Sequence, residues 1–282
     1  SGADIQEINI IRKHLSRIKG GRLLEMAAPA RTITLILSDV IGNDIGSIAS
    51  GPTAPDPSTY SDALAVLTRY ELIDRVPESI RSVLSAGEEG KIPETLKPGN
   101  PSFQNAPLLI LADNKTAVRA GVEEAVRSGY SGEEIADPFQ GEAWQTGKYF
   151  GEHLRKKHKQ RNPAHPPICM IAGGETTVQL GTDPAGMGGR NLEAALGAVQ
   201  PLSSLKDVML VSLATDGEDG PTDAAGAVVT GETADRGHTA GLSPDEFLEK
   251  HASYHYFQPL GNLIKTGPTG TNVNDLILMF LL

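Results

Sequence analysis

The sequence predicts an α/β protein, and three observations lead to this expectation. Four short apolar runs, rich in β-branched and aliphatic residues, lie at 33–37, 108–111, 168–172 and 208–214. Each run is nearly continuous, which is typical of parallel strands that helices cover on both faces. Helical spacing and helix-start signals occur between and after the runs. With 282 residues, the chain is long enough for two domains, at about 100 to 200 residues per domain.

Composition places the chain among globular proteins without a membrane span. Hydrophobic residues make up 39% and charged residues 21%, which excludes the disordered class. The longest apolar run, 276–282, is too short to cross a bilayer. A net charge of -10 disfavours nucleic-acid binding, because the phosphate backbone requires clustered Lys and Arg. An anionic substrate therefore needs a local basic site.

The cysteine content and the start of the chain indicate its cellular setting. Cys169 is the only cysteine, so it cannot form an internal disulfide, and its apolar neighbours predict a buried strand. We therefore expect a cytoplasmic protein, in a reducing compartment. No apolar leader is present in the sequence, and because it begins without Met we expect it to start partway into a longer protein.

Two helices and one linker have clear local signals. Apolar residues between positions 60 and 67 keep the i, i+3, i+4, i+7 spacing of an amphipathic helix. Ser243-Pro244-Asp245-Glu246 combines an N-cap residue, a proline at the first helical position and an acid two residues later, which predicts a helix start. The stretch 155–167 is first basic and then proline-rich, and we expect a linker there. This places the domains at 1–162 and 163–282.

Each predicted strand ends in small and acidic residues. Ser38-Asp39 follow the first strand, Asp113-Asn114 the second, residues 173–177 the third and residues 215–220 the fourth. In doubly wound sheets ligands bind outside the carboxyl ends of the strands, so these four ends predict one crevice. Taken alone, Asp113-Asn114 is more typical of a helix cap than of a ligand site.

A glycine-rich segment with one arginine, Gly-Met-Gly-Gly-Arg-Asn at 186–191, opens a predicted helix. Its backbone N–H groups could approach phosphate oxygens, helped by the helix dipole. The segment is neither a Walker A motif nor a dinucleotide fingerprint, so a plain flexible loop is an equal alternative. Arg190 could stabilise charge on a transferring phosphoryl group, or it could be an ordinary surface residue.

The segment 215–223 concentrates four carboxylates in nine residues after a strand. Carboxylate oxygens suit Mg²⁺, and one carboxylate could act as a general base, whereas the alternative is a polar turn. Segments 50–57 and 266–275 offer hydroxyls and amides but could be simple connectors. The cations in segment 12–21 could neutralise a substrate or form a solvated face. The histidines at 14, 238, 251 and 255 lack metal-ligand spacing, which favours structural or surface roles.

Several of these motifs together resemble the glycerate 2-kinase family with a C-terminal MOFRL domain, whose members are often labelled hydroxypyruvate reductases. They run across the chain in the family's order. They are RKHLSRIKGG at 12–21, SDVIGNDIGSIASGPTAPDP at 38–57, AGGETTV at 172–178, GMGGRNLEAAL at 186–196, ATDGEDGPTDAAGA at 214–227 and TGPTGTNVNDL at 266–276. As a set they are highly specific, although each alone is not.

The resemblance implies two Rossmann-like, three-layer α/β domains. It also implies phosphorylation of D-glycerate by ATP and Mg²⁺ in the cleft between them, without a nucleic-acid or membrane partner and with homo-oligomer formation left open. Family members carry a long segment before the point that matches Ser1, including a Gly-Lys segment and a Gly-Gly-Gly-Ser loop. The first domain is therefore expected to be incomplete.

Carried over residue by residue, the resemblance assigns Arg190 to the transferring phosphoryl group and Asp216 to the glycerate hydroxyl or to Mg²⁺. The nucleotide would face Gly173, Gly174, Glu175, Thr176, Gly188, Gly189 and Asn191. The substrate cleft would be lined by Ser38, Asp39, Ser50, Gly51, Thr53, Thr271, Asn272 and Asn274. Two alternatives stay open. One is an NAD(P)H-dependent hydroxypyruvate reductase, against which the missing dinucleotide fingerprint counts, and the other is a nucleotide-binding fragment without turnover.

Overall fold

The chain folds into two compact units. The computed structural model describes residues 2–162, 164–181 and 186–282. Unit 1 comprises the chain up to Ile36 together with Gly42–Leu111, and unit 2 comprises Leu37–Ile41 together with Ala112–Leu282. Each unit has its own hydrophobic core, and each is described separately below.

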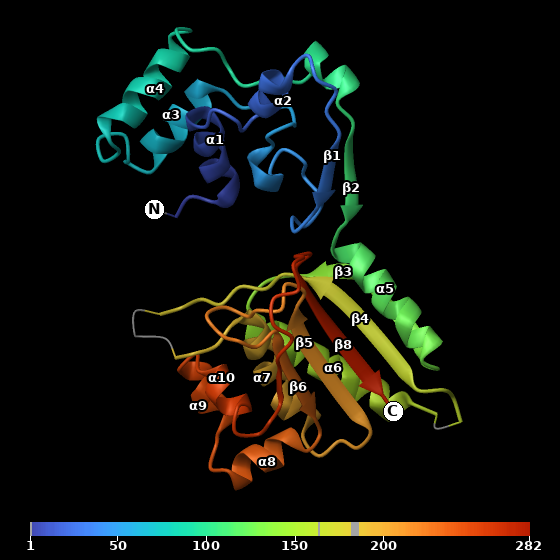
Figure 1. Ribbon diagram of the computed structural model, residues 1–282. Helices are drawn as coiled ribbons and strands as arrows, with labels where there is room; N and C mark the ends of the chain where they lie inside the picture. Colours follow the sequence, from blue (N-terminus) through green and yellow to red (C-terminus); the bar gives the residue numbers. More distant parts are fainter. Residues whose placement is uncertain (1, 163, 182–185) are drawn as a thin grey trace. The chain divides into compact units, whose positions relative to one another are not determined.

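Unit 1 is mainly helical. Its elements are α1 (Ile5–Leu15), α2 (Arg22–Ala27), η1 (Ile48–Ser50), α3 (Tyr60–Arg69), α4 (Glu78–Glu88) and η2 (Pro101–Asn105). Helices α1, α3 and α4 pack together around Tyr60, Ala63, Leu67 and Leu84 (Figure 1). Capping boxes fix the first turns of α1 and α3, from Asp4 and Thr59 respectively. Strand β1 (Thr34–Leu37) pairs with β2 (Leu108–Ala112).

Unit 2 is built on a mixed sheet. In its described residues the sheet has six strands in the order β3-β4-β8-β5-β6-β7. Strand β3 pairs parallel with β4, whereas β8 lies antiparallel between β4 and β5, and β6 and β7 extend the sheet antiparallel. The strands are β3 (Ser131–Phe139), β4 (Ile168–Gly174), β5 (Val208–Ala214), β6 (Gly226–Thr230), β7 (Leu263–Ile264) and β8 (Asp275–Leu281).

Helices cover both faces of this sheet (Figure 1). On one face α5 (Asn114–Arg127) packs on β3 and β4, and on the other face lie α6 (Ala143–Gln160) and α7 (Arg190–Leu202). Strand β8 shows the two-sided burial: Ile277, Met279 and Leu281 join the α7 side, while Leu276, Leu278 and Phe280 join the α5 side. Three short helices complete the unit, α8 (Thr233–Thr239), α9 (Pro244–Glu249) and α10 (Ser253–Phe257). Unit 2 is thus a three-layer α/β structure.

The four predicted strands are confirmed as β1, β2, β4 and β5, and the two predicted helices as α3 and α9. The expectation of parallel strands was wrong for β5, which pairs antiparallel with β6 and β8, and was met only in part for β4, which pairs parallel with β3 and antiparallel with β8. Buried strands read as continuous apolar runs whatever their direction, so the pattern does not determine how a strand pairs. Ser243 precedes α9 as expected, but its side chain makes no capping hydrogen bond.

The division into compact units differs from the boundary expected at 162–163. Residues 155–160 form the end of α6, which packs along α7, and β3 pairs with β4. These contacts join residues 112–160 to the rest of unit 2, so the units divide near residue 112.

Two further expectations concern single features. Cys169 is buried on β4, and burial raises the pKa of its thiol to about 11. Among the described residues, none of the helices combines the length and apolar character needed to cross a membrane.

Candidate active site in unit 2

Three segments of unit 2 meet where β4 and β5 end and β8 begins. In the strand register Asp275, the first residue of β8, lies opposite Gly174 at the end of β4 and Ala214 at the end of β5. The polar residues that follow β4 and β5 therefore flank the start of β8. Asp216 and Thr176 line a common cavity of about 780 Å³, together with Gly188, Gly189 and Arg190 from the start of α7. The predicted convergence of strand ends is confirmed for these two strands.

Arg190 is the first residue of α7 and carries the positive charge of the site. Its Nη1 lies 2.5 Å from Glu175 Oε1, its Nε lies 2.7 Å from Asp275 Oδ2, and its Nη2 lies 3.2 Å from Asp275 Oδ1. Burial alone would lower the pKa of Arg190, but the charges of Asp275 and Glu175 outweigh burial and raise it. The guanidinium therefore keeps its charge and is held in a fixed orientation.

Asp275 is a site residue that the sequence analysis missed. Its side chain is 1% exposed, and burial raises its pKa to about 6, against the opposing charge of Arg190. Asn114 secures this strand start, because its Nδ2 donates to the carbonyls of Val273 at 2.8 Å and Asp275 at 3.1 Å. A carboxylate at the start of an otherwise apolar run, as in Asn274-Asp275-Leu276, was the signal available in the sequence.

The N-terminus of α7 is already occupied by a carboxylate of the protein. Asp219 accepts the backbone N–H of Asn191 at 3.0 Å and that of Leu192 at 2.7 Å. Asn191 is itself buried, and its Oδ1 accepts a hydrogen bond from Ser212 Oγ at 2.9 Å. The amides of residues 191 and 192 are thus not free for a phosphate, and the role expected from the helix dipole is filled by Asp219.

Packing explains why glycines occupy this region. A Cβ on Gly189 would lie 2.4 Å from Asp219, and one on Gly188 would lie 2.5 Å from Ser253 Oγ. On β4, a Cβ on Gly173 would lie 1.9 Å from Asn114 Oδ1, and one on Gly174 would lie 2.1 Å from the Phe139 carbonyl. These glycines allow close approach of protein groups, and Gly188 and Gly189 also line the cavity.

The cavity around Asp216 carries more negative than positive charge. Glu193, Asp216, Glu218 and Asp219 line it, and Arg190 is the only Lys or Arg among the described lining residues. The described part of the chain contains no group of three or more His, Cys, Asp or Glu residues placed to hold a metal ion. Asp216 as a Mg²⁺ ligand therefore stays a prediction, in which phosphate oxygens and water would complete the coordination, as is usual for this ion.

The C-terminal loop packs beside Asp216. Thr269 Oγ1 donates to the Thr215 carbonyl at 2.7 Å, and Thr215 Oγ1 donates to the Asn274 carbonyl at 2.7 Å. The Val273 N–H completes this contact by donating to Thr215 Oγ1 at 2.9 Å. These bonds hold the C-terminal loop against Thr215, next to Asp216, whereas the substrate role that the resemblance implies for Thr271, Asn272 and Asn274 stays a prediction.

The remaining predicted substrate residues lie elsewhere in the chain. Ser38 is buried, and Asp39 is exposed, in the short segment after β1. Ser50, Gly51 and Thr53 belong to unit 1, where Thr53 Oγ1 accepts from Thr34 Oγ1 at 2.9 Å. Ala49 and Ser50 both have left-handed backbones, with φ of 51° and 59°. Such non-glycine conformations cost about 1–3 kcal/mol each and cluster at functional sites.

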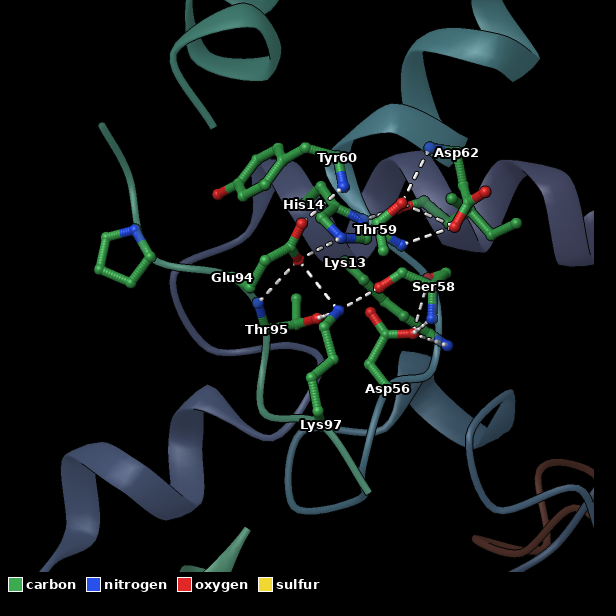
Figure 2. Close-up of polar contacts among 12 residues, drawn as sticks. Lys13, His14, Asp56, Ser58, Thr59, Tyr60, Asp62, Glu94, Thr95 and Lys97 are labelled. Atoms are coloured by element: carbon green, nitrogen blue, oxygen red, sulfur yellow. Dashed lines mark hydrogen bonds and ion pairs between the residues drawn. The ribbon is translucent and has the colours of Figure 1, made fainter. Parts of the chain in front are cut away.

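A polar network in unit 1 joins side chains from α1, from the start of α3 and from the segment around Glu94 (Figure 2). Lys13 Nζ lies 3.3 Å from Asp56 Oδ1, and these side chains are 9% and 0% exposed. Lys97 Nζ donates to Glu94 Oε2 at 2.9 Å, and Glu94 Oε1 accepts the Tyr60 N–H at 2.9 Å. Lys13 of the RKHLSRIKGG motif therefore neutralises a carboxylate of the protein, which was not among the roles that the sequence analysis considered.

Backbone hydrogen bonds attach the loop of Ser50 and Gly51 to the glycines of that motif. The Gly20 N–H donates to the Ser50 carbonyl at 3.2 Å, and the Gly21 N–H donates to the Gly51 carbonyl at 2.8 Å. Gly20 and Gly21 have φ of 61° and 82°, which favours glycine at both positions. Two motifs that are distant in the sequence thus form one structural unit.

Comparison with known proteins covers almost the whole chain. Residues 1–85 match the model of the domain of unknown function DUF4147, and residues 168–275 match the MOFRL family. A glycerate 2-kinase of Pyrococcus horikoshii is 40% identical over 99% of this chain and 62% of its own length. A glycerate kinase of Macaca fascicularis is 35% identical over 99% of this chain and 80% of its own length.

Solved structures agree with these matches. A crystal structure of a glycerate kinase from Thermotoga maritima superposes with a TM-score of 0.87 and 38% identity, over 100% of this chain and 64% of that one. The chain thus spans somewhat less than two thirds of the Pyrococcus and Thermotoga proteins that it matches.

Proposed function

The chain belongs to the glycerate kinase family that carries a MOFRL domain, and from this premise we propose that its protein transfers the γ-phosphoryl group of ATP to a hydroxyl of D-glycerate. One observation carries the proposal. Arg190 and Asp216 line the same cavity, near the ends of β4 and β5. Two carboxylates hold the charged guanidinium of Arg190 in place, and Asp216 is partly exposed. Phosphoryl transfer depends on this kind of positioned charge more than on covalent chemistry by the protein.

In the proposed reaction, the glycerate hydroxyl oxygen forms a bond to the γ-phosphorus while the bond from that phosphorus to the bridging oxygen of ADP breaks. Asp216 orients the hydroxyl and accepts its proton. Arg190 stabilises the negative charge that develops on the transferring group. Glu175 and Asp275 hold the guanidinium in place, so little reorganisation is needed when this charge develops.

The charge of the cavity supports a requirement for a divalent cation. Burial raises the pKa of Glu193 and Asp219, but Asp216 and Glu218 also line the cavity, and its one arginine is already paired with Glu175 and Asp275, so an unaccompanied triphosphate would be repelled. When bound, Mg²⁺ would neutralise phosphate charge, and Asp216 as its protein ligand is the alternative to Asp216 as the base. Thr271, Asn272, Asn274, Ser38 and Asp39 are proposed to bind the substrate. A functional role for the unit 1 loop of Ser50, Gly51 and Thr53 stays a separate prediction. The strain stored at Ala49 and Ser50 supports a functional role for that loop.

The test is an assay of ADP formation with the full-length gene product, D-glycerate and Mg-ATP. We expect turnover of about 1 to 100 per second, the ordinary range for kinases. Asp216→Asn should abolish most of this activity and leave the thermal unfolding curve unchanged, whereas Glu232→Gln, on an exposed loop away from this cavity, should leave both unchanged. Absence of ADP formation together with NADH oxidation by hydroxypyruvate would refute the kinase and establish a reductase.

A further inference from the structure

A second cavity adjoins the candidate active site. It measures about 770 Å³ and shares Glu193 and His251 with the cavity around Asp216. Its other walls come from the start of α6, from Gln179 and from α9. Pockets of this size are typical of small-molecule sites, and the shared residues make the two cavities neighbours.

Two carboxylate oxygens at this second cavity lack hydrogen-bond donors. Glu193 is 2% exposed, and its Oε1 pairs with His251 Nδ1 at 2.8 Å. Its Oε2 is buried without a partner among the described residues, and so is Oε2 of Glu142, the residue that precedes α6. Burial raises the pKa of Glu193, and the nearby charge of Glu142 adds to this effect. A ligand that donates N–H groups here would supply what these oxygens lack.

An aromatic ring stands beside these acceptors. Trp144, in the first turn of α6, lines the cavity and is 38% exposed. Exposed tryptophan faces are stacking platforms for planar rings, and stacking of a nucleobase is worth about 1–3 kcal/mol. Leu248 from α9 adds an apolar wall. A planar, amine-bearing ligand therefore fits the cavity better than a metal ion, since no metal-holding group of side chains occurs in the described residues.

We propose that this second cavity receives the adenine ring of the nucleotide. Trp144 stacks on the ring, and Glu193 and Glu142 accept hydrogen bonds from its exocyclic amine. The inference rests on the proposed kinase function, because the phosphates then extend past Glu193 and His251 toward Arg190 and Asp216. Glu193 belongs to the walls of both cavities, so the same residue lies beside the base and beside the phosphates.

Trp144 is the only tryptophan of the chain, so the tryptophan fluorescence of the chain reports on this cavity. Titration of the 282-residue chain with Mg-ATP should change the tryptophan fluorescence, whereas Mg-tripolyphosphate, which lacks a base, should bind without that change. Calorimetry run in parallel measures binding independently of Trp144. Binding of Mg-ATP with silent fluorescence, and with the same affinity as Mg-tripolyphosphate, would overturn the adenine site and leave the kinase proposal standing.

Inosine triphosphate tests the amine directly, because it carries a carbonyl where ATP carries the amine. We expect it to bind at least about tenfold more weakly than ATP, because it lacks the amine that donates to Glu193 and Glu142. Glu193→Gln should remove this preference, because an amide can donate to the carbonyl. The matched control is Glu246→Gln on the exposed side of α9, outside both cavities, which should keep the preference for ATP.

Three further outcomes have defined meanings. Failure of the chain to bind either Mg-ATP or Mg-tripolyphosphate would refute nucleotide binding and the adenine site together. An equal fluorescence change with spermidine or KCl alone would assign the cavity to a cation and overturn the adenine site. If Glu193→Gln unfolds, Trp144→Leu provides the second test: Mg-ATP affinity should fall about tenfold while Mg-tripolyphosphate affinity stays constant.

Discussion

Arg190 illustrates how one side chain depends on its immediate partners. Its guanidinium contacts Glu175 and Asp275, and the second of these is buried in the sheet. The fork geometry of arginine matches two carboxylates at once, which a lysine ammonium cannot do. Its orientation is therefore set before any substrate binds, and this is the residue-scale basis of the proposed chemistry.

Arg190→Ala should lower kcat much more than it weakens ATP binding, because the guanidinium acts on charge that develops in the transition state. By comparison with other arginines in phosphoryl transfer, we expect a loss of about a thousandfold. Steady-state kinetics and calorimetry with Mg-ATP measure the two effects. Arg190→Lys should recover only part of the rate, since it keeps the charge but not the fork. A loss below about tenfold for Arg190→Ala would remove the residue from the catalytic role.

We expect activity to fall in mild acid, because Asp275 then becomes protonated. Its pKa of about 6 is raised by burial, so its carboxylate becomes protonated as the pH falls through about 6 and the ion pair with Arg190 weakens. The stability effect has the opposite sign. Because this pKa lies above the unfolded value of about 3.9, the ionised carboxyl costs stability above pH 6, and the cost disappears as the pH falls toward 4.

The measurement is kcat against pH between about 5 and 8 for the protein and for Asp275→Asn. The variant should be slower at pH 7.5, by about tenfold if one positioning contact is lost, and its profile should be flat near pH 6. An unchanged acidic limb in the variant would show that another group titrates there.

At the scale of elements, the contact between α6 and α7 depends on small residues. A Cβ on Gly147 would lie 1.7 Å from the Ala194 carbonyl oxygen, and one on Gly197 would lie 2.1 Å from the Trp144 carbonyl oxygen. The two helices can approach this closely only because both positions lack a side chain. Their packing also sets the distance between Trp144 and Glu193, at the starts of the two helices.

Gly147→Ala should therefore destabilise unit 2, because one helix must move away from the other. Overpacking of this kind typically costs about 1–3 kcal/mol. Urea unfolding followed by circular dichroism measures the change. The control is Gly181→Ala, where none of the described residues lies within 4 Å of the added Cβ and the backbone is not left-handed. Equal stability of the two variants would show that the helices tolerate separation.

At the scale of the whole molecule, the two units have separate hydrophobic cores. The core of unit 1 centres on Tyr60, Ala63 and Leu67 of α3 and on Leu84 of α4. The cores of unit 2 lie on the two faces of its sheet. A substitution in one core should consequently act first on the unit that contains it.

Leu84→Ala should destabilise unit 1, because it creates a cavity at a fully buried position. The expected loss in the free energy of unfolding is about 2–5 kcal/mol. Hydrogen exchange followed by mass spectrometry should show lost protection in α1, α3 and α4, while β4, β5 and β8 keep theirs. Leu196→Ala in α7 is the matched change in unit 2 and should give the reverse pattern. Uniform loss of protection in either variant would show that the molecule unfolds as one cooperative unit.

The sequence determined the elements and the chemistry available at their ends. Continuous apolar runs identified β1, β2, β4 and β5, and the Gly-rich segment before Arg190 identified the start of α7. These features depend on neighbours within a few residues, and local patterns record them directly. The motif set was also sufficient to indicate the family, because each motif is a contiguous stretch.

Only the tertiary structure decided which of these groups meet. Arg190 and Asp275 are 85 residues apart, and they touch because β8 enters the sheet antiparallel between β4 and β5. The same holds for Lys13 with Asp56 and for Glu193 with His251, which are 43 and 58 residues apart. Burial and pairing of such distant groups depend on strand order and helix packing, which are global properties that a local pattern does not contain.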